Sequence, residues 1–301
     1  MTVAILKQTM TTTKLLHCYQ NGNYVVSIFS DGTKTRESVS GNFNPRFPES
    51  IDLKITNFCN LSVLCKYCHE KSTVYGEHAN FERILNFVDG LPQGVEIAIG
   101  GGNPLSHPDI DEICTEFNRQ GLIANITINQ EHIEKAKIPE KVKGVGISFR
   151  RRKFIPKIKE INHVIHHLIL GVHTWEDFLW LCNNYYAPKI LWLGFKTIGN
   201  GNQYFAEKGF TIKQNIDLIK TNLETSLNHT NLIAFDNLAI EQLSPHEIFS
   251  KGDFMGDDGQ YSFYFDAVQN KYAIGSSYNE RKEAYGLKAT EIFESLKSGI
   301  N

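Results

Sequence analysis

The sequence predicts an α/β fold in which a parallel sheet is closed or partly closed as a barrel. From residue 50 onward, short apolar runs alternate with amphipathic segments, the pattern of strands followed by helices. Several of the amphipathic segments open on Asp, Ser or Thr, which are typical helix N-caps. Repeated strand-then-helix units favour parallel strands with helical crossovers, and the functional site of such folds lies at the carboxyl ends of the strands.

The apolar runs define the strands of this barrel, which are expected at 51–56, 94–99, 122–128, 143–149, 164–170, 189–196 and 231–235. The amphipathic segments define the helices, which are expected near 80–90, 108–119, 131–137, 155–162, 174–184 and 211–227.

Both ends of the chain carry shorter elements. Residues 24–39 are typical of a β-hairpin, because the strand-like run Tyr24 to Phe29 is followed by the turn pair Asp31-Gly32 and a polar strand. Two strand-like runs, at 261–268 and 271–276, precede a final helix near 290–297. We therefore expect three parts, namely an N-terminal hairpin and linker at 1–49, a barrel at 50–243 and a strand-strand-helix extension at 244–301.

The composition excludes some classes of protein. The chain has 301 residues, of which 41% are apolar, so it can bury a large core. Lys and Arg number 31 and Asp and Glu 33, so the overall charge points neither to nucleic acid nor to a membrane. The apolar run at 3–6 is too short for a signal peptide or a membrane span, and we expect a cytoplasmic protein.

Three of the six cysteines, Cys59, Cys65 and Cys68, fall within ten residues, directly after the first expected barrel strand. A loop at the end of a strand can turn several thiolates toward one point, and thiolates suit iron–sulfur clusters or zinc. Three cysteines without an obvious fourth favour a cluster with one open iron. Structural zinc remains an alternative, in which His69 or Cys18 would supply the fourth ligand.

Polar or glycine-rich segments end the next three strands. The second strand runs into a turn that contains Gly101, Gly102, Asn103 and Pro104. Glycines let a ligand approach the backbone and proline stiffens the turn, although a plain tight turn has the same composition. Asn129 and Ser148, and more weakly Thr127, end the third and fourth strands, where they suit a ribose or a carboxylate but also a helix cap.

The later strands add further candidates. In the fifth strand His163 and His167 share one face and His166 lies on the other. One of these faces is directed toward the barrel interior, and a histidine there suits either a bound ligand or the core. Lys196 and Asp236 end the sixth and seventh strands, which places a cation and an anion at the barrel mouth.

From about residue 50 to 240 the chain resembles the radical SAM superfamily, whose signature is three cysteines in the loop after the first barrel strand. Cys65 and Cys68 match in spacing, and Tyr67 is the expected aromatic residue before the last cysteine. Five residues separate Cys59 from Cys65, where the common pattern has three. Two extra residues add at most about 7 Å of chain, which a bulge can absorb.

The resemblance implies a partial (β/α)6-type TIM-like barrel and a single 4Fe-4S cluster on Cys59, Cys65 and Cys68. It also implies that S-adenosylmethionine binds at Tyr67, Gly101, Gly102, Asn103, Pro104, Asn129 and Ser148. Asn103 stands where the family's Gly-Gly-Glu-Pro motif has an acid that holds the methionine ammonium. An amide oxygen can accept that hydrogen bond at about 0.5–1.5 kcal/mol, against about 1.5–3 kcal/mol for a charged acceptor.

The activity implied is reductive cleavage of S-adenosylmethionine to a 5'-deoxyadenosyl radical, which abstracts hydrogen from an unknown substrate. An electron donor such as flavodoxin or ferredoxin is implied with it. A different class of function remains open, because the longer cysteine gap and Asn103 are also compatible with an inactive scaffold protein that binds a metal or cluster.

Overall fold

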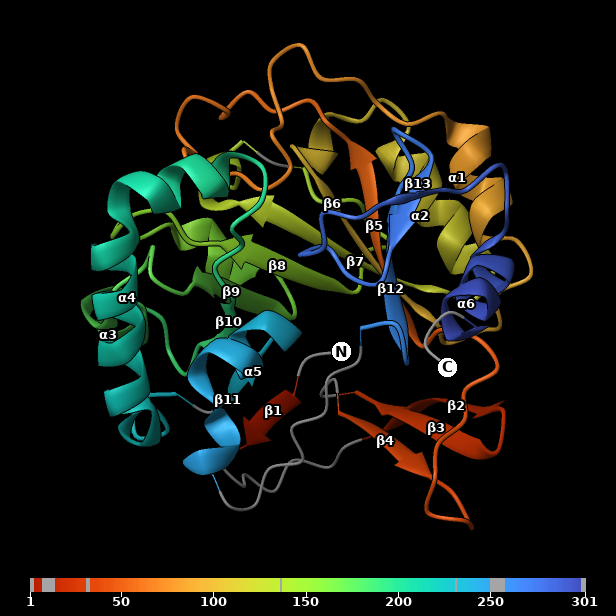
Figure 1. Cartoon of the computed structure of the whole chain (residues 1–301), viewed down its shortest axis with the longest axis horizontal. Coiled ribbons are helices and arrows are strands. Elements are labelled where there is room, and N and C mark those ends of the chain that lie inside the picture. The colour runs from red at the N-terminus through yellow and green to blue at the C-terminus, as the bar shows by residue number, and fades with distance from the viewer. Residues whose placement is uncertain are drawn as a thin grey trace.

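The computed structural model describes residues 3–6, 14–30, 33–135, 137–230, 232–249 and 258–298. The turn pair expected at Asp31-Gly32 lies outside these residues. Within them the fold is α/β with one large, mostly parallel sheet, which is consistent with a partial barrel. The strands follow the order β1-β11-β10-β9-β8-β7-β6-β5-β12-β13-β14 (Figure 1).

The expected barrel strands are present and each is parallel to its neighbours in this series. They are β5 (Ser50–Thr56), β6 (Glu96–Gly101), β7 (Ile123–Asn129), β8 (Gly144–Ser148), β9 (Val164–Ile169), β10 (Lys189–Leu193) and β11 (Leu232–Phe235). Alternate side chains on β5, at Ile51, Leu53 and Ile55, are fully buried in the main hydrophobic core. Asp52 and Lys54 between them point to the opposite face.

The helices cover the outside of this sheet, with α1 and α2 on the right of Figure 1 and α3 and α4 on the left. They are α1 (Phe81–Val88), α2 (Ile110–Arg119), α3 (Trp175–Asn184), α4 (Asn200–Ser226), α5 (Asn237–Leu243) and α6 (Ala289–Ser298). Local sequence explains several starts. Thr174 and Asp177 form a capping box at α3, and Asn80 and Asp236 cap α1 and α5 through their side chains.

Four helical segments differ from the sequence expectation. The helices expected near 131–137 and 155–162 are short 3₁₀ turns, η2 (Gln130–His132) and η3 (Pro156–Glu160), within the described residues. Helix α4 begins at Asn200 rather than near 211, and α5 is additional. The early start of α4 depends on a tertiary contact, because the Asn200 amide donates to the Cys68 carbonyl at 3.0 Å.

The N-terminal residues contribute to two sheets. Strand β1 (Val3–Leu6) is antiparallel to β11. A separate antiparallel sheet consists of β2 (Leu15–Asn21), β3 (Tyr24–Phe29) and β4 (Lys34–Glu37), one strand more than the expected hairpin. Buried Glu49 ties this sheet to the chain entering the barrel, since its carboxylate accepts from Tyr24 Oη at 2.6 Å and from Arg36 Nε at 2.8 Å.

The C-terminal extension continues the main sheet. Strand β12 (Ser262–Asp266) is parallel to β5, and β13 (Lys271–Ala273) and β14 (Lys282–Glu283) follow in antiparallel order. The extension therefore lies directly beside the strand that leads into the cysteine loop. The division into three domains stays a prediction. In the part of the chain that the structure describes, no helix has both the length and the apolar character that crossing a membrane requires.

Candidate functional site

The cysteine loop follows β5 and passes over the upper ends of the strands in Figure 1. Backbone hydrogen bonds fold it into consecutive turns. Cys59 N donates to Thr73 O at 2.8 Å, Leu64 N to Leu61 O at 2.9 Å, and Cys68 N to Cys65 O at 3.0 Å. The long interval between the first two cysteines is thus taken up by a compact turn.

The three thiols of this loop are close enough to affect one another. Burial, followed by the charges of Cys68 and Cys59, raises the pKa of Cys65 to about 11. Burial raises the pKa of Cys59 as well, with a further contribution from Cys68. In the described residues, no three Cys, His, Asp or Glu side chains are gathered in a metal-holding arrangement as they stand. Binding a cluster would therefore require these thiols to lose their protons and converge.

The other thiols lie elsewhere in the fold. Cys18 is exposed on β2, Cys114 is buried in α2, and Cys182 lies on α3. His69, the other candidate for a fourth zinc ligand, has its Nε2 atom 3.3 Å from Glu70 Oε1 and 3.4 Å from Lys196 Nζ. The loop itself therefore offers three soft thiols, a set that would suit an iron–sulfur cluster with one open iron.

The glycine turn after β6 is packed against the start of the cysteine loop. Gly102 N donates to Thr56 O at 2.9 Å, and Asn103 N donates to Phe58 O at 2.7 Å. A Cβ atom on Gly102 would overlap the Phe58 carbonyl oxygen and lie 3.1 Å from Cys59 Cβ. Only glycine allows this approach, so the turn and the cysteines are brought together at one edge of the sheet.

Asn103 carries an unsatisfied acceptor in this turn. The residue is 9% exposed, and its Oδ1 atom has no hydrogen-bond partner. Its backbone carbonyl is used locally, since it accepts from both Ser106 N and Ser106 Oγ. An unsatisfied buried acceptor costs about 1–3 kcal/mol. A donor such as the ammonium of S-adenosylmethionine would satisfy it, so the residue fits the group. Pro104 is buried and begins the turn η1 (Pro104–Ser106) that follows.

The polar ends of β7 and β8 lie in register beside the loop. Asn129 is paired with Ser148 on the neighbouring strand. The Asn129 amide nitrogen lies 3.9 Å from Cys65 Sγ, while its Oδ1 accepts from Glu131 N at 3.0 Å. Asn129 therefore faces the cysteines and also caps the next turn.

Tyr67 packs against α4. Its ring lies 5.7 Å from that of Tyr204 in an edge-to-face arrangement, and burial raises its pKa. A Cβ on Gly201, in the first turn of α4, would lie 3.6 Å from Tyr67 O. The ring thus has a packing role, and its place beside the adenine stays a prediction.

The histidine pair of β9 divides between the two faces of the sheet. A Cβ on Gly146 would lie 2.5 Å from His167 Nε2 and 3.0 Å from Thr127 Oγ1, so His167 lies over β8 in the barrel interior. His166 lies against the Tyr185 ring at 4.9 Å on the other face. Burial lowers the pKa of each histidine to about 4, with a further contribution from His166 at His167. His167 is therefore neutral at physiological pH, and its Nδ1 atom has no hydrogen-bond partner.

Sequence reasoning missed Lys54 and Glu70, which form buried ion pairs behind the cysteine loop. Lys54 gave a usable signal, because a charge alternates there with the apolar residues of β5. Arg150 was also missed. Its Nη1 lies 3.5 Å from the Leu64 carbonyl of the loop, and its charge opposes the rise in the pKa of Cys65.

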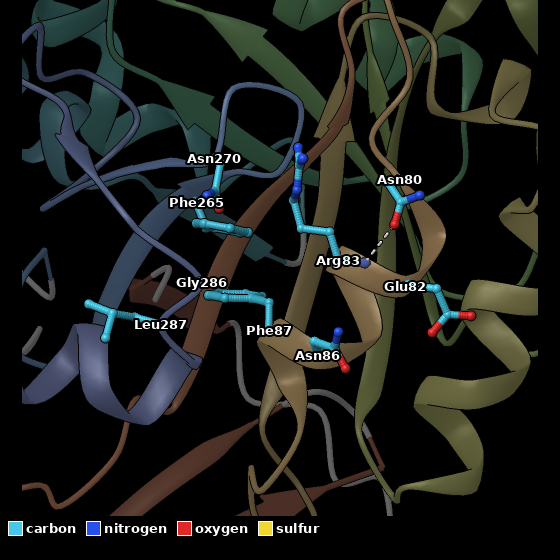
Figure 2. A pocket seen from close by; sticks show the side chains of 9 residues that line it. All are labelled: Asn80, Glu82, Arg83, Asn86, Phe87, Phe265, Asn270, Gly286 and Leu287. Atoms are coloured by element: carbon cyan, nitrogen blue, oxygen red, sulfur yellow. Dashed lines mark hydrogen bonds between the residues drawn. The ribbon is translucent and has the colours of Figure 1, made fainter.

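Surface pockets lined by described residues flank the barrel. One, of about 280 Å³, lies beyond the end of β10 and is lined by Phe195, Lys196, Thr197, Leu238, Glu241, Gln242, Ser277 and Tyr278. Figure 2 shows the other, of about 270 Å³, between α1 and the C-terminal extension. Arg83 crosses this second pocket and donates to the carbonyls of Ala267 and Val268 at 2.9 and 3.2 Å. That pocket therefore lies at the joint, by which we mean the contact between α1 of the barrel and the C-terminal extension.

Residues 53–226 match the family model described as the radical SAM superfamily. The chain belongs to this superfamily. Membership implies an enzyme that uses S-adenosylmethionine and an iron–sulfur cluster, together with a substrate and a source of electrons. The matched region contains the three cysteines of the loop and the glycine turn, and it ends before α5 and the C-terminal extension.

Solved structures of SuiB from Streptococcus suis share this radical SAM fold. SuiB bound to the precursor peptide SuiA is 14% identical, with 85% of this chain and 67% of that chain covered and a TM-score of 0.55. SuiB bound to S-adenosylmethionine is also 14% identical, with 85% and 68% covered and a TM-score of 0.52. At this identity the likeness concerns the fold alone. The comparison with curated proteins gave no match.

Proposed function

We propose that this protein is a radical SAM enzyme in which Cys59, Cys65 and Cys68 hold one 4Fe-4S cluster. The observation that carries the proposal is the contact between two motifs. The backbone N–H of Asn103, in the glycine turn, donates a hydrogen bond to the carbonyl of Phe58, one residue before the first cysteine. In this proposal the thiols and the unsatisfied Asn103 Oδ1 would lie at one edge of a partial (β/α)6-type barrel.

The chain's own residues would bind and orient S-adenosylmethionine. Asn103 Oδ1 would accept from the methionine ammonium, and the glycines of the turn would let the cofactor approach the backbone. Asn129 and Ser148 would bind the ribose, and Tyr67 would lie beside the adenine. When bound, the cluster and S-adenosylmethionine supply one-electron reduction and a radical that abstracts hydrogen.

The substrate would enter the barrel interior, where the His167 ring lies over Gly146 of β8. An electron donor such as flavodoxin or ferredoxin would reduce the cluster, and the protein would work in the cytoplasm. The identity of the substrate is open.

Anaerobic reconstitution with iron and sulfide tests the ligand assignment. We expect a brown protein whose visible absorbance bleaches with dithionite. Alanine variants should divide into two groups by iron content: Cys59, Cys65 and Cys68 variants lose iron, whereas Cys18, Cys114 and Cys182 variants keep it. Equal loss of iron from the Cys18 and Cys65 variants would show that the assignment is wrong. A colourless protein that binds zinc would instead favour the scaffold alternative.

A further inference from the structure

Glu70 lies two residues after Cys68, and its carboxylate is buried among charges. The side chain is 6% exposed. Lys54 Nζ lies 2.8 Å from Glu70 Oε2 and 3.1 Å from Asp266 Oδ2. Lys54 and Asp266 are 3% and 0% exposed, so one buried cation bridges two buried carboxylates.

Arg281 and Tyr264 complete this group, which we call the buried charge cluster (Lys54, Glu70, Tyr264, Asp266 and Arg281). Arg281 Nη1 donates to Tyr264 Oη at 3.1 Å and to Asp266 Oδ2 at 3.2 Å, and its Nη2 lies 3.6 Å from Glu70 Oε1. Tyr264 Oη donates to Glu70 Oε1 at 3.0 Å. The two cations balance the two carboxylates, and loss of any one leaves a buried charge uncompensated.

Glu70 lies between two cations in this setting. Lys54 Nζ contacts its Oε2 at 2.8 Å, and Arg281 Nη2 lies 3.6 Å from its Oε1. His69 Nε2 lies 3.3 Å from the same Oε1. Lys54 and Arg281 are therefore the cations that face the Glu70 carboxylate.

The buried charge cluster joins three parts of the chain. Lys54 comes from β5, Glu70 from the end of the cysteine loop, and the other members from the C-terminal extension. A second link runs parallel to it, because Lys196 Nζ donates to Ser276 Oγ at 2.8 Å and lies 3.4 Å from His69 Nε2. The C-terminal extension thus contacts the end of the cysteine loop directly at Glu70, and through Lys196 at His69. This extension lies outside the 53–226 region that matches the family.

We propose that the C-terminal extension, through the buried charge cluster, positions the cysteine loop and sets the electrostatic field at its thiols, and so tunes the reduction potential of the iron–sulfur cluster. This inference rests on the proposed function. Net charge and hydrogen bonding around a cluster are principal determinants of its potential, and partners that orient the ligands act on it as well. Glu70, Asp266 and Arg281 act as positioning residues.

The charges predict the sign of each effect. Glu70→Gln removes a negative charge and should favour electron uptake, which raises the potential. Arg281→Gln removes a positive charge and should lower it. The double variant restores neutrality and should return close to the wild-type value. If the substitutions only loosened the cysteine loop, the reduction potential would shift in the same direction in both single variants.

The test is a redox titration of the reconstituted full-length protein, followed by the electron paramagnetic resonance signal of the reduced cluster. At the wild-type midpoint we expect the ratio of reduced to oxidised cluster to rise about tenfold in Glu70→Gln and to fall about tenfold in Arg281→Gln. A tenfold change corresponds to about 59 mV for a one-electron couple. Iron content and thermal unfolding are measured for every variant.

Arg83→Gln is the matched control, because Arg83 anchors the same extension from α1, at the joint shown in Figure 2. It should weaken the joint without shifting the potential. If a buried variant does not fold, Lys196→Gln replaces it, and loss of this half-buried cation beside His69 should lower the potential.

Shifts in the same direction for Glu70→Gln and Arg281→Gln, or unshifted potentials in folded variants that hold a full cluster, would overturn the inference alone. For Lys196→Gln, a raised or unchanged potential would do the same. A wild-type protein that takes up no iron would instead overturn the proposed function.

Discussion

Gly102→Ala should separate the glycine turn from the cysteine loop. The added Cβ would overlap the Phe58 carbonyl oxygen and lie 2.7 Å from its carbonyl carbon. Contacts under 3.0 Å are essentially never made by a real Cβ, so backbone must move. The movement would also strain the hydrogen bond from Asn103 N to Phe58 O.

The cost follows from these two effects. Overpacking against a rigid neighbour costs about 1–3 kcal/mol, and loss of a hydrogen bond about 0.5–1.5 kcal/mol. Together they lower the free energy of unfolding by about 2–4 kcal/mol, which corresponds to a fall in Tm of roughly 3–6 °C for a chain of this length. Because the displaced backbone leads into Cys59, iron content after reconstitution should fall as well.

Gly100→Ala is the control for this change, since a Cβ at Gly100 meets nothing within 4 Å. Thermal unfolding followed by circular dichroism should show a lowered Tm for Gly102→Ala and a Tm near that of the wild type for Gly100→Ala. Equal stability and equal iron content in the two variants would refute the claim that the turn and the loop are in close contact.

Three further predictions concern binding and pH. Asn103→Leu should weaken S-adenosylmethionine binding by about 1 kcal/mol, or about fivefold in Kd, in calorimetric titrations; unchanged affinity would mean that this turn is only a turn. Tyr67→Phe should bind the cofactor normally and Tyr67→Ala more weakly, and an adenine found on the opposite wall in a cofactor complex would contradict this. Burial lowers the pKa of His166, His167 and His173 to about 4, so below pH 6.5 the unfolded chain binds protons that the fold excludes. The free energy of unfolding is not reduced by these histidines above pH 6.5, and it should fall as the pH is lowered toward 4, by about 2 kcal/mol per histidine at pH 5. Equal urea midpoints at pH 7 and pH 5 would count against this prediction.

The parallel strands were predictable because buried apolar side chains alternate with less buried ones along the sequence of each strand. On β7, for example, Ala124, Ile126 and Ile128 are buried in turn. The radical SAM family was also predictable from the sequence, because the cysteines and the glycine turn are local motifs. The match to the family model confirmed it. The individual site residues stay predictions.

Non-local contacts explain most of what local sequence did not predict. The first turns of α4 carry Gly201 and Gly209, which disfavour helix, and their start is tied to the Cys68 carbonyl. Strand β2 was missed because its outer end is exposed, with Leu15 48% accessible. The pairing of β12 with β5 joins distant parts of the chain. The ion pair between Lys54 and Asp266 depends on that pairing, so no periodicity could have indicated it.

The central claim, that this chain is an active radical SAM enzyme, is tested most directly by the products of S-adenosylmethionine. The reconstituted protein is incubated anaerobically with S-adenosylmethionine and dithionite, and products are quantified by liquid chromatography and mass spectrometry. We predict 5'-deoxyadenosine and methionine in equal amounts from the wild type and neither from Cys65→Ala. A wild-type protein with a full cluster that forms no 5'-deoxyadenosine, or a Cys65→Ala variant that forms as much as the wild type, would contradict the account.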